Sequence, residues 1–195
     1  MNARRAAIAA VVVFALAAAW VLFVAMPRWY AARRAQLQPG TPAAASSPAA
    51  AVRKITATLF YVSDDGMSLM QVQREVPFGG TPAEQARAII EAQLAPVAPQ
   101  VSAIPADVKL RALFVTERGD AFVDLSGDVS TKHPGGSLNE IFTVYSIVNA
   151  LTVNLPAVTH VQILVDGKEV DTLAGHVDLR HPLAKSLEWV VHDTQ

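Results

Sequence analysis

The sequence predicts an α+β domain with two helices on one face of a mixed sheet, preceded by a single N-terminal transmembrane helix. Three observations carry this prediction. Residues 6–26 form an uncharged apolar run, residues 27–54 form a flexible linker rich in Pro, Ala and Ser, and residues 55–175 alternate β-rich and helical stretches. The expected order is β-β-α-β-β-α-β-β, which leaves a βαββαβ-like core when the short pairing strands are set aside.

The composition limits the classes of function. The chain has 195 residues and a net charge of −1, so it offers no electrostatic support for a nucleic-acid partner. It contains no cysteine, which excludes disulfides, thiolate metal sites and thiol catalysis. We therefore expect neither a nucleic acid nor a cofactor to bind.

The apolar run at residues 6–26 has about the 20 residues that a helix needs to cross the hydrocarbon core of a membrane. Trp29 and Tyr30 follow it, where interfacial aromatic residues belong. The alternatives are a cleaved signal peptide and a buried core helix. The run is long for a signal peptide, lacks a small-x-small cleavage site, and has no polar face.

A single-pass anchor in the inner, cytoplasmic membrane is therefore the favoured interpretation. Basic residues flank both ends of the run, so the positive-inside rule is nearly balanced. Orientation then rests on the usual export of a domain that follows an N-terminal anchor, which places the domain on the periplasmic side. Residues 36–51 of the linker lack hydrophobic periodicity and form either a plain spacer or a tether that reaches toward a cell-wall or protein partner.

The first half of the domain is expected to form a hairpin and a helix. Two β-rich stretches, 55–62 and 69–76, flank an Asp-Asp-Gly turn. The helix begins at a capping box of Thr81 and Glu84 and ends before Pro96.

The second half is expected to repeat this pattern. Residues 110–115 and 121–125 form a second hairpin, the loop 126–136 follows, and a capping box of Ser137 and Glu140 starts the second helix. One apolar stripe of this helix contains Leu138, Ile141, Phe142, Tyr145, Val148 and Leu151. The other side carries Asn139, Thr143, Ser146 and Ala150.

The last elements are a strand, a turn and a tail. Residues 161–165 are nearly all apolar, as a central strand should be, and Asp166 and Gly167 supply turn chemistry. Residues 169–173 are expected to form a short edge strand, and residues 176–195 a C-terminal extension. Three of its residues are expected to pack back on the domain: Trp189, Val190 and Val191.

Four ordered motifs resemble the GerMN domain of spore-germination and sporulation proteins. They are the helix ARAIIEAQL, the strand and loop AFVDLSGDV, the helix GGSLNEIFTVYSIVNALT, and the strand and turn VTHVQILVDGKEV. The segment HVDLRHPL that follows is also similar to such proteins. The resemblance covers residues 55–183, and the order of the four motifs is more specific than any one of them.

The resemblance implies a membrane-attached, envelope-facing α+β module without known catalysis. A sporulation member of the family is tied to assembly of a protein channel between two cells, and binding or remodelling of the cell wall has been inferred for others. That member carries two copies of the domain, whereas this chain has room for one. The resemblance therefore implies the class of module and not the sporulation role.

Most polar residues of the family motifs have a sufficient structural interpretation. Asp124 and Ser126 end a strand and brace the following loop. Asn149 lies at the edge of the apolar stripe, and we expect its amide to anchor a neighbouring loop, the one after Asp124 being the first choice. A contact between Asn149 and a partner is the alternative. The exposed loop is the candidate for partner contact, through Asp128, Thr131, Lys132 and His133.

Chemical sites are less well supported than these structural roles. An anion seat at the glycines before Ser137 lacks the long Gly-Lys pattern of a nucleotide loop. A nucleophile at Ser137 with His133 as base lacks a third member. The metal pattern of His176, Asp178 and His181 has imperfect spacing. We therefore expect no catalytic, cofactor or metal residues.

Three functions follow from this sequence. The favoured one is a non-enzymatic envelope module that binds a protein or peptidoglycan partner. The second is a homo-oligomeric scaffold or ring-building module that pairs through the edge strand at 169–173. The third is a small cell-wall hydrolase, which requires a concave pocket with two titratable groups within hydrogen-bond reach.

Overall fold

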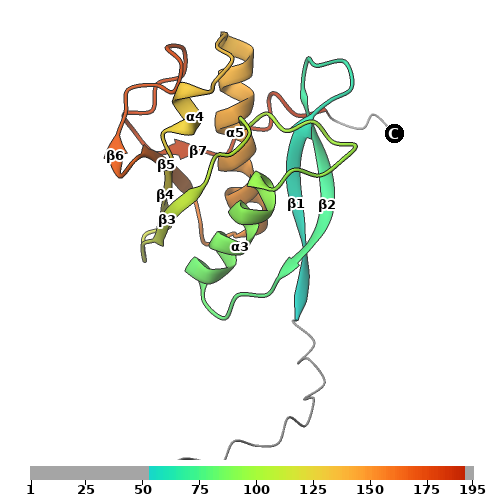
Figure 1. Ribbon diagram of the computed structural model, residues 1–195. Helices are drawn as coiled ribbons and strands as arrows, with labels where there is room; N and C mark the ends of the chain where they lie inside the picture. The colour runs from blue at the N-terminus through green and yellow to red at the C-terminus, as the bar shows by residue number, and fades with distance from the viewer. Residues whose placement is uncertain (1–52, 192–195) are drawn as a thin grey trace, which may run out of the picture. The chain divides into compact units, whose positions relative to one another are not determined.

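The computed structural model describes residues 53–191, and the expected anchor at residues 6–26 lies outside them. No helix in the described part of the chain is both long and apolar enough to span a membrane. Figure 1 shows the arrangement of the helices and strands in the domain.

The domain is α+β and contains two sheets. The strands of the first sheet are β1 (Lys54–Val62) and β2 (Leu69–Pro77), which pair antiparallel. The strands of the second are β3 (Leu110–Val115), β4 (Asp120–Leu125), β5 (His160–Val165), β6 (Lys168–Glu169) and β7 (Leu183–Ala184). The helices are α3 (Pro82–Leu94), the single turn α4 (Asp128–Thr131) and α5 (Ser137–Asn154).

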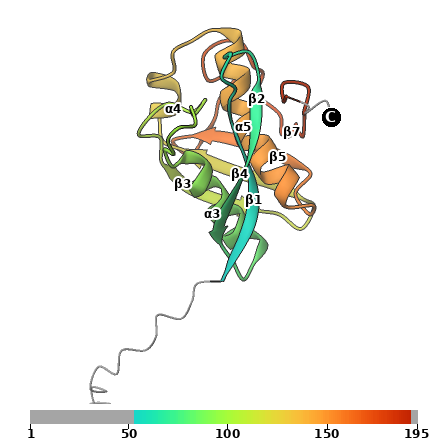
Figure 2. The same cartoon turned by 90° about the vertical axis from the view of Figure 1, so that its right-hand side faces the viewer.

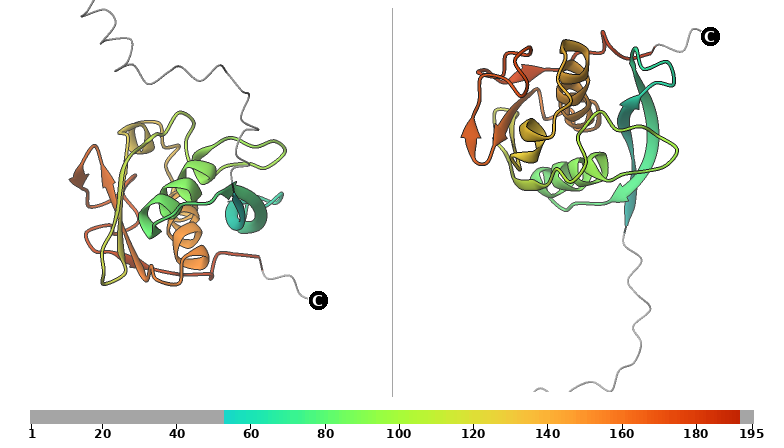
Figure 3. Two further views of the ribbon diagram at one scale, coloured as in Figure 1. Left: turned by 90° about the horizontal axis from the view of Figure 1, so that it is seen from below. Right: turned by 45° about the horizontal axis from the view of Figure 1, so that its top comes forward.

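The predicted mixed sheet with both helices on one face is present as the second sheet, but the prediction that the first hairpin belongs to it is wrong. The β1–β2 hairpin is a sheet of its own, and α3 and α5 lie between it and the second sheet. Figures 1 and 3 show the hairpin on one side of the helices and the second sheet on the other, and Figure 2 looks at the same layers with the hairpin in front. The described domain therefore has three layers.

The composition of α5 explains the third layer. Its expected polar side is buried at Thr143, Ser146 and Ala150, while Leu138 and Tyr145 of the expected stripe are only half-buried. Small side chains on one side let a second layer approach the helix closely, and α5 accordingly packs on β1 as well as on β5. Because the helix is covered from two directions, its polar side chains need partners inside the protein.

The second sheet confirms the expected β3–β4 hairpin and the central strand. Strand β5 pairs parallel with β4, and α5 connects the two strands. The expected edge strand at 169–173 is shorter than predicted, because β6 contains only Lys168 and Glu169. Strand β7 takes the remaining part of the same edge by pairing with the start of β5.

The segment expected as a C-terminal extension contributes to the domain. Leu179 is buried, and Leu183 pairs with Val161 in the second sheet. Val190 is also buried and lies beside Leu69 of β2, as expected for the tail. Val191 remains about half-exposed.

Local chemistry explains the start of α3. The Thr81 hydroxyl accepts a hydrogen bond from the Glu84 amide at 3.2 Å, and the Glu84 carboxylate accepts one from the Thr81 amide at 3.1 Å. This reciprocal pair confirms the predicted capping box.

Two side-chain amides complete the hydrogen bonds of the outer edge of β1. Gln93 of α3 accepts from the Phe60 amide at 2.9 Å and donates to the Phe60 carbonyl at 2.7 Å. Asn154 of α5 does the same at Thr58, with distances of 2.8 and 2.7 Å. Each amide replaces one residue of a neighbouring strand, so β1 can be covered by helices without losing backbone hydrogen bonds.

Replacement of Gln93 tests this account. Gln93→Met keeps the approximate volume but leaves the buried N–H and C=O of Phe60 without partners. We expect the free energy of unfolding to fall by about 2–4 kcal/mol in urea denaturation. Gln71→Met, at an exposed glutamine of β2, is the matched control and should change it by less than about 0.5 kcal/mol. Equal effects of the two substitutions would contradict the role given to Gln93.

Candidate functional site

The amino end of α5 differs from its predicted form. Gly136 occupies the N-cap position with a φ of 86°, and no side chain caps the helix. Ser137 is the first helical residue and is exposed, so the predicted capping box of Ser137 and Glu140 is wrong. Glycine supplies this backbone conformation without strain, which leaves the Glu140 side chain free for another role.

Glu140 binds the backbone of the segment that follows β6. Its carboxylate is fully buried and accepts hydrogen bonds from the amides of Leu173, Ala174 and His176 at 2.8, 2.9 and 2.8 Å. The His176 ring also lies within reach, with Nδ1 3.1 Å from Oε2. Glu140 thereby fixes a stretch of backbone that has no regular secondary structure.

These donors explain the ionisation of Glu140. Burial alone would raise its pKa, but the amides of Ala174, His176 and Leu173 that donate to the carboxylate outweigh burial and hold the pKa below its ordinary value of 4.5. The folded protein therefore stabilises the charged form of Glu140.

His133 lies beside this carboxylate and is occupied on both ring nitrogens. Nδ1 accepts a hydrogen bond from the Gly135 amide at 3.0 Å, and Nε2 lies 3.1 Å from the Thr143 hydroxyl. Since Nδ1 is an acceptor, the neutral ring carries its proton on Nε2 and donates it to Thr143. Burial lowers the pKa of His133, which favours the same neutral form. His133 therefore orders the loop and is not placed to act as a base for Ser137.

Of the other residues of the expected contact loop, Asp128 and Thr131 lie in α4 and Lys132 is its C-cap residue. The Thr131 hydroxyl donates to the Gly127 carbonyl at 3.1 Å. The Lys132 ammonium lies 3.1 Å from Asp107 and 3.2 Å from Asp128. Thr131 and Lys132 nevertheless remain exposed, so α4 presents them to solvent on a backbone that is held in place.

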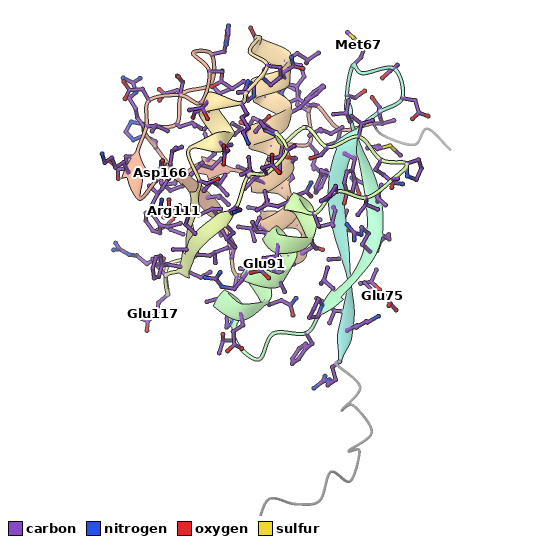
Figure 4. All side chains as sticks on the ribbon, viewed as in Figure 1. Met67, Glu75, Glu91, Arg111, Glu117 and Asp166 are labelled. Carbon is purple, nitrogen blue, oxygen red and sulfur yellow. The ribbon has the colours of Figure 1, made fainter. Side chains whose placement is uncertain are left out.

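A second polar cluster joins the ends of β3, β4 and β5. Arg111 donates to Asp124 at 3.2 Å and to Asp166 at 2.7 Å. The other oxygen of Asp124 accepts from the Gly167 amide at 2.7 Å, and Asp166 also accepts from Gly127 at 3.2 Å. Figure 4 shows Arg111 and Asp166 facing each other.

Ser126, another residue of the family motif, lies next to this cluster in the chain and also has a structural role. The Ser126 hydroxyl accepts from the Lys109 amide at 3.1 Å and lies 3.4 Å from Asp128, so it braces the loop as expected. Sequence reasoning missed Arg111. Its neighbours Leu110 and Ala112 lie at a register irregularity of the β3–β4 pair, and the sequence carries no sign of that irregularity.

Asn149 anchors a neighbouring segment, but not the one after Asp124. It is fully buried, donates to the Ser186 carbonyl at 2.7 Å, and accepts from the Ser186 amide at 3.2 Å. This pair fixes the segment that follows β7. The expectation of a structural anchor is confirmed, and the partner loop is different.

The structure does not bring the H-x-D-x-x-H residues together. His176 contacts Glu140, whereas Asp178 forms two hydrogen bonds with Arg180 at 2.9 and 2.6 Å. The hydrogen bonds from Arg180 also lower the pKa of Asp178. Within residues 53–191, no three His, Asp or Glu side chains converge on a common metal position.

Two open hollows lie at the carboxyl ends of the long helices. The one beside α3 is lined by Asp107 and Lys109, and the one beside α5 by His160 and Lys185. Asp107 is engaged by Lys132, which is not part of the lining. In neither of these two hollows does a hydrogen bond join the titratable pair.

Comparison with known proteins agrees with the observed architecture. The chain matches a family described as "Germane: Sporulation and spore germination" over residues 58–171. The tandem GerMN domains of the sporulation protein GerM from Bacillus subtilis align with a TM-score of 0.53 and 15% identity. That alignment covers 68% of this chain and 46% of the tandem protein, and at this identity it shows the fold alone.

Two further structures are similar at lower scores. The first GerMN domain of GerM has a TM-score of 0.47 and 16% identity, with 67% of this chain and 95% of that one covered. A Clostridium perfringens protein inferred to be a lipoprotein has a TM-score of 0.49 and 23% identity, with coverages of 69% and 90%. Among curated proteins, none gives a significant match.

Removal of the Glu140 charge should change both stability and its dependence on acid. Glu140→Gln places an amide N–H against backbone donors, so we expect the free energy of unfolding at pH 7 to fall by about 2–4 kcal/mol. The lowered pKa of Glu140 contributes stability that is present above pH 4.5 and is lost as the pH falls below it. The variant should therefore show a shallower loss of melting temperature between about pH 5 and pH 3.

Glu117→Gln, at an exposed glutamate, is the control and should follow the wild-type acid curve. Because the Glu140 charge also raises the pKa of His133, the difference between the curves reports Glu140 together with this neighbour. Parallel acid curves for wild type and Glu140→Gln would contradict the assigned role.

Asn149→Ala removes both hydrogen bonds to the Ser186 backbone and leaves its buried groups without partners. We expect thermal denaturation to show a melting temperature lower by roughly 5–10 °C. Ser186→Ala keeps the same backbone bonds and should melt close to the wild type. An unchanged melting curve for Asn149→Ala would refute the anchoring role.

Proposed function

Since this chain belongs to the Germane family of sporulation and spore-germination proteins, we propose that it is a membrane-anchored, non-enzymatic envelope module that binds a protein or peptidoglycan partner. The match covers most of the described domain. The GerMN-like fold agrees with this membership.

The proposed location rests on the sequence before the domain. The apolar run at residues 6–26 is long enough for one membrane-spanning helix, and the linker at residues 27–54 separates it from the folded part. We place the anchor in the cytoplasmic membrane and the domain on the periplasmic side. A reporter fused after Gln195 tests this orientation, because an exported domain would carry the reporter out of the cytoplasm.

We propose no catalytic role because the polar side chains that could serve one are hydrogen-bonded within the domain. Glu140 holds a backbone segment, His133 is occupied on both nitrogens, and Asp124 binds Arg111 and Gly167. Acid–base or nucleophilic catalysis needs such groups directed at a substrate. Their engagement with the backbone supports a binding module instead.

The observation that carries the binding function is the form of α4. Its internal hydrogen bonds and ion pairs fix the backbone, while Thr131 and Lys132 stay exposed. A fixed backbone lowers the entropy cost of binding, since the exposed groups are already positioned. The surface formed by Thr131 and Lys132 is our candidate for partner contact.

Retention of envelope components tests the proposal. The full chain in detergent is mixed with purified cell wall, and in parallel is crosslinked in native membranes. We expect a retained partner, and Lys132→Ala should weaken retention about fivefold, as for an interfacial charge worth about 1 kcal/mol. Lys185→Ala, an exposed lysine beside the opposite end of α5, is the control. Failure to retain any partner in both assays would refute the proposal.

A further inference from the structure

The two edges of the β1–β2 hairpin are treated differently. The edge of β1 is closed by Gln93 at Phe60 and by Asn154 at Thr58. Thr58 and Phe60 therefore direct their backbone groups away from β2. Their cross-strand partners Gln73 and Gln71 must then direct their own N–H and C=O groups away from β1.

By the same alternation, Glu75 also faces outward. We call the backbone groups of Gln71, Gln73 and Glu75 the open edge of β2. Within residues 53–191, none of these groups makes a hydrogen bond to another segment. The open edge spans about 17 Å of extended chain at 3.3–3.4 Å per residue.

One end of this edge already pairs with an extended segment. Leu69 is the next outward-facing residue, and its amide donates to the Trp189 carbonyl at 2.7 Å. The Val191 amide donates to the Leu69 carbonyl at 2.8 Å, and the segment runs parallel to β2. The backbone of β2 is thus available for strand pairing, and the described tail occupies Leu69 alone.

The other long edge strand in the described domain is a weaker candidate. Strand β3 has six residues and a register irregularity between Leu110 and Ala112, which disrupts a regular ladder. Strand β2 has nine residues and pairs with β1 in continuous register. A regular ladder of hydrogen bonds is therefore favoured at β2.

The side chains of β2 define what would pair with it. Met70 and Val72 are half-buried on one face, whereas Gln71, Gln73 and Glu75 are exposed on the other. Figure 4 shows Glu75 directed into solvent from β2. An added strand extends both faces, so apolar residues at every second position would pack beside Met70 and Val72. On the other face Glu75 already pairs with Lys54 at 2.9 Å, so uncharged polar residues would match that face.

We propose that the open edge of β2 binds an extended segment of a partner protein by strand addition, a segment in which apolar and uncharged polar residues alternate. The inference rests on the proposed function as a partner-binding module and identifies the partner as a protein. Main-chain hydrogen bonds supply the affinity, and the alternation of side chains supplies the selectivity.

A defined peptide tests the backbone pairing directly. The probe is a fluorescent nine-residue peptide of alternating Val and Thr with a Lys at each end, mixed with the full chain in detergent. Binding is measured by anisotropy against the same peptide N-methylated at alternate residues, which removes the donors on one edge. We expect the unmethylated peptide to bind at least about tenfold more tightly.

Substitutions in β2 provide the second arm. Gln73→Pro removes the outward N–H, at a position where an edge strand tolerates proline. Gln73→Thr also loses the glutamine side chain but keeps the N–H, so it is the matched control. We expect about tenfold weaker binding for Gln73→Pro and wild-type binding for Gln73→Thr. If Gln73→Pro does not fold, the N-methylated peptide still decides the matter.

Equal affinity of the two peptides, or no binding up to about 1 mM, would overturn the inference. Crosslinks from position 73 that reach only a second copy of this chain would also overturn it. The proposed function has its own test: it fails if the wild-type chain retains no envelope partner in the cell-wall and crosslinking assays, whatever the peptide result. If the partner is retained equally by wild type and Gln73→Pro, the proposed function stands and the open edge of β2 is not its site.

Discussion

Helix α5 is buried between two sheets, so each polar side chain buried on it needs a hydrogen-bond partner. Ser146 and Thr152 donate to carbonyls of α5 itself. The other polar side chains find their partners in other segments. Four of them bind backbone groups. Glu140 binds residues 173–176, Thr143 the Ala103 carbonyl, Asn149 Ser186, and Asn154 Thr58. The two amides and the carboxylate lie on one helix, yet they hold segments far apart in the chain. The helix therefore organises long-range structure through hydrogen bonds as well as through packing.

This arrangement explains how segments without regular secondary structure belong to the domain. Residues 95–109 and 170–191 are mostly irregular, and their backbone groups receive few partners from the sheets. A buried group without a partner costs about 1–3 kcal/mol, against about 5–15 kcal/mol for the stability of a whole domain. Loss of one anchor on α5 is therefore a large perturbation. The ionised state of Glu140 makes one of these anchors sensitive to acid.

The sequence was informative where structure depends on neighbouring residues. The capping box of Thr81 and Glu84, the two hairpins and the central strand follow from local spacing, and all are present. The same local pattern at Ser137 and Glu140 predicted a second capping box that does not form. The spacing of Ser137 and Glu140 fits a capping box, and nothing in that spacing shows that the Glu140 carboxylate binds the backbone of His176, 36 positions away.

The sequence also did not show that the domain has two sheets, because this too depends on contacts between distant residues. The alternation of side chains in the β1–β2 hairpin would also suit a strand pair inside a larger sheet. The hairpin can form a sheet of its own because Gln93 and Asn154 bind the outer backbone groups of β1. Nothing in the sequence distinguishes Gln93 or Asn154 from an ordinary polar residue of a helix. Arg111 was missed because its partners come from β4 and from the turn after β5. The candidate contact residues of α4 were found because an exposed polar loop stands out in sequence, although its helical form does not.

The use of polar groups within the domain narrows where a partner would bind. Side chains that appear reactive in sequence are hydrogen-bonded within the domain, so recognition falls to surfaces whose groups are both positioned and exposed. The exposed side of α4 offers side chains on a fixed backbone, and β2 offers the backbone itself. These surfaces differ in chemistry: the first depends on the Lys132 charge and weakens with salt, whereas the second depends on main-chain hydrogen bonds and is much less sensitive to salt. The salt dependence of retention therefore separates the two surfaces before any residue is changed.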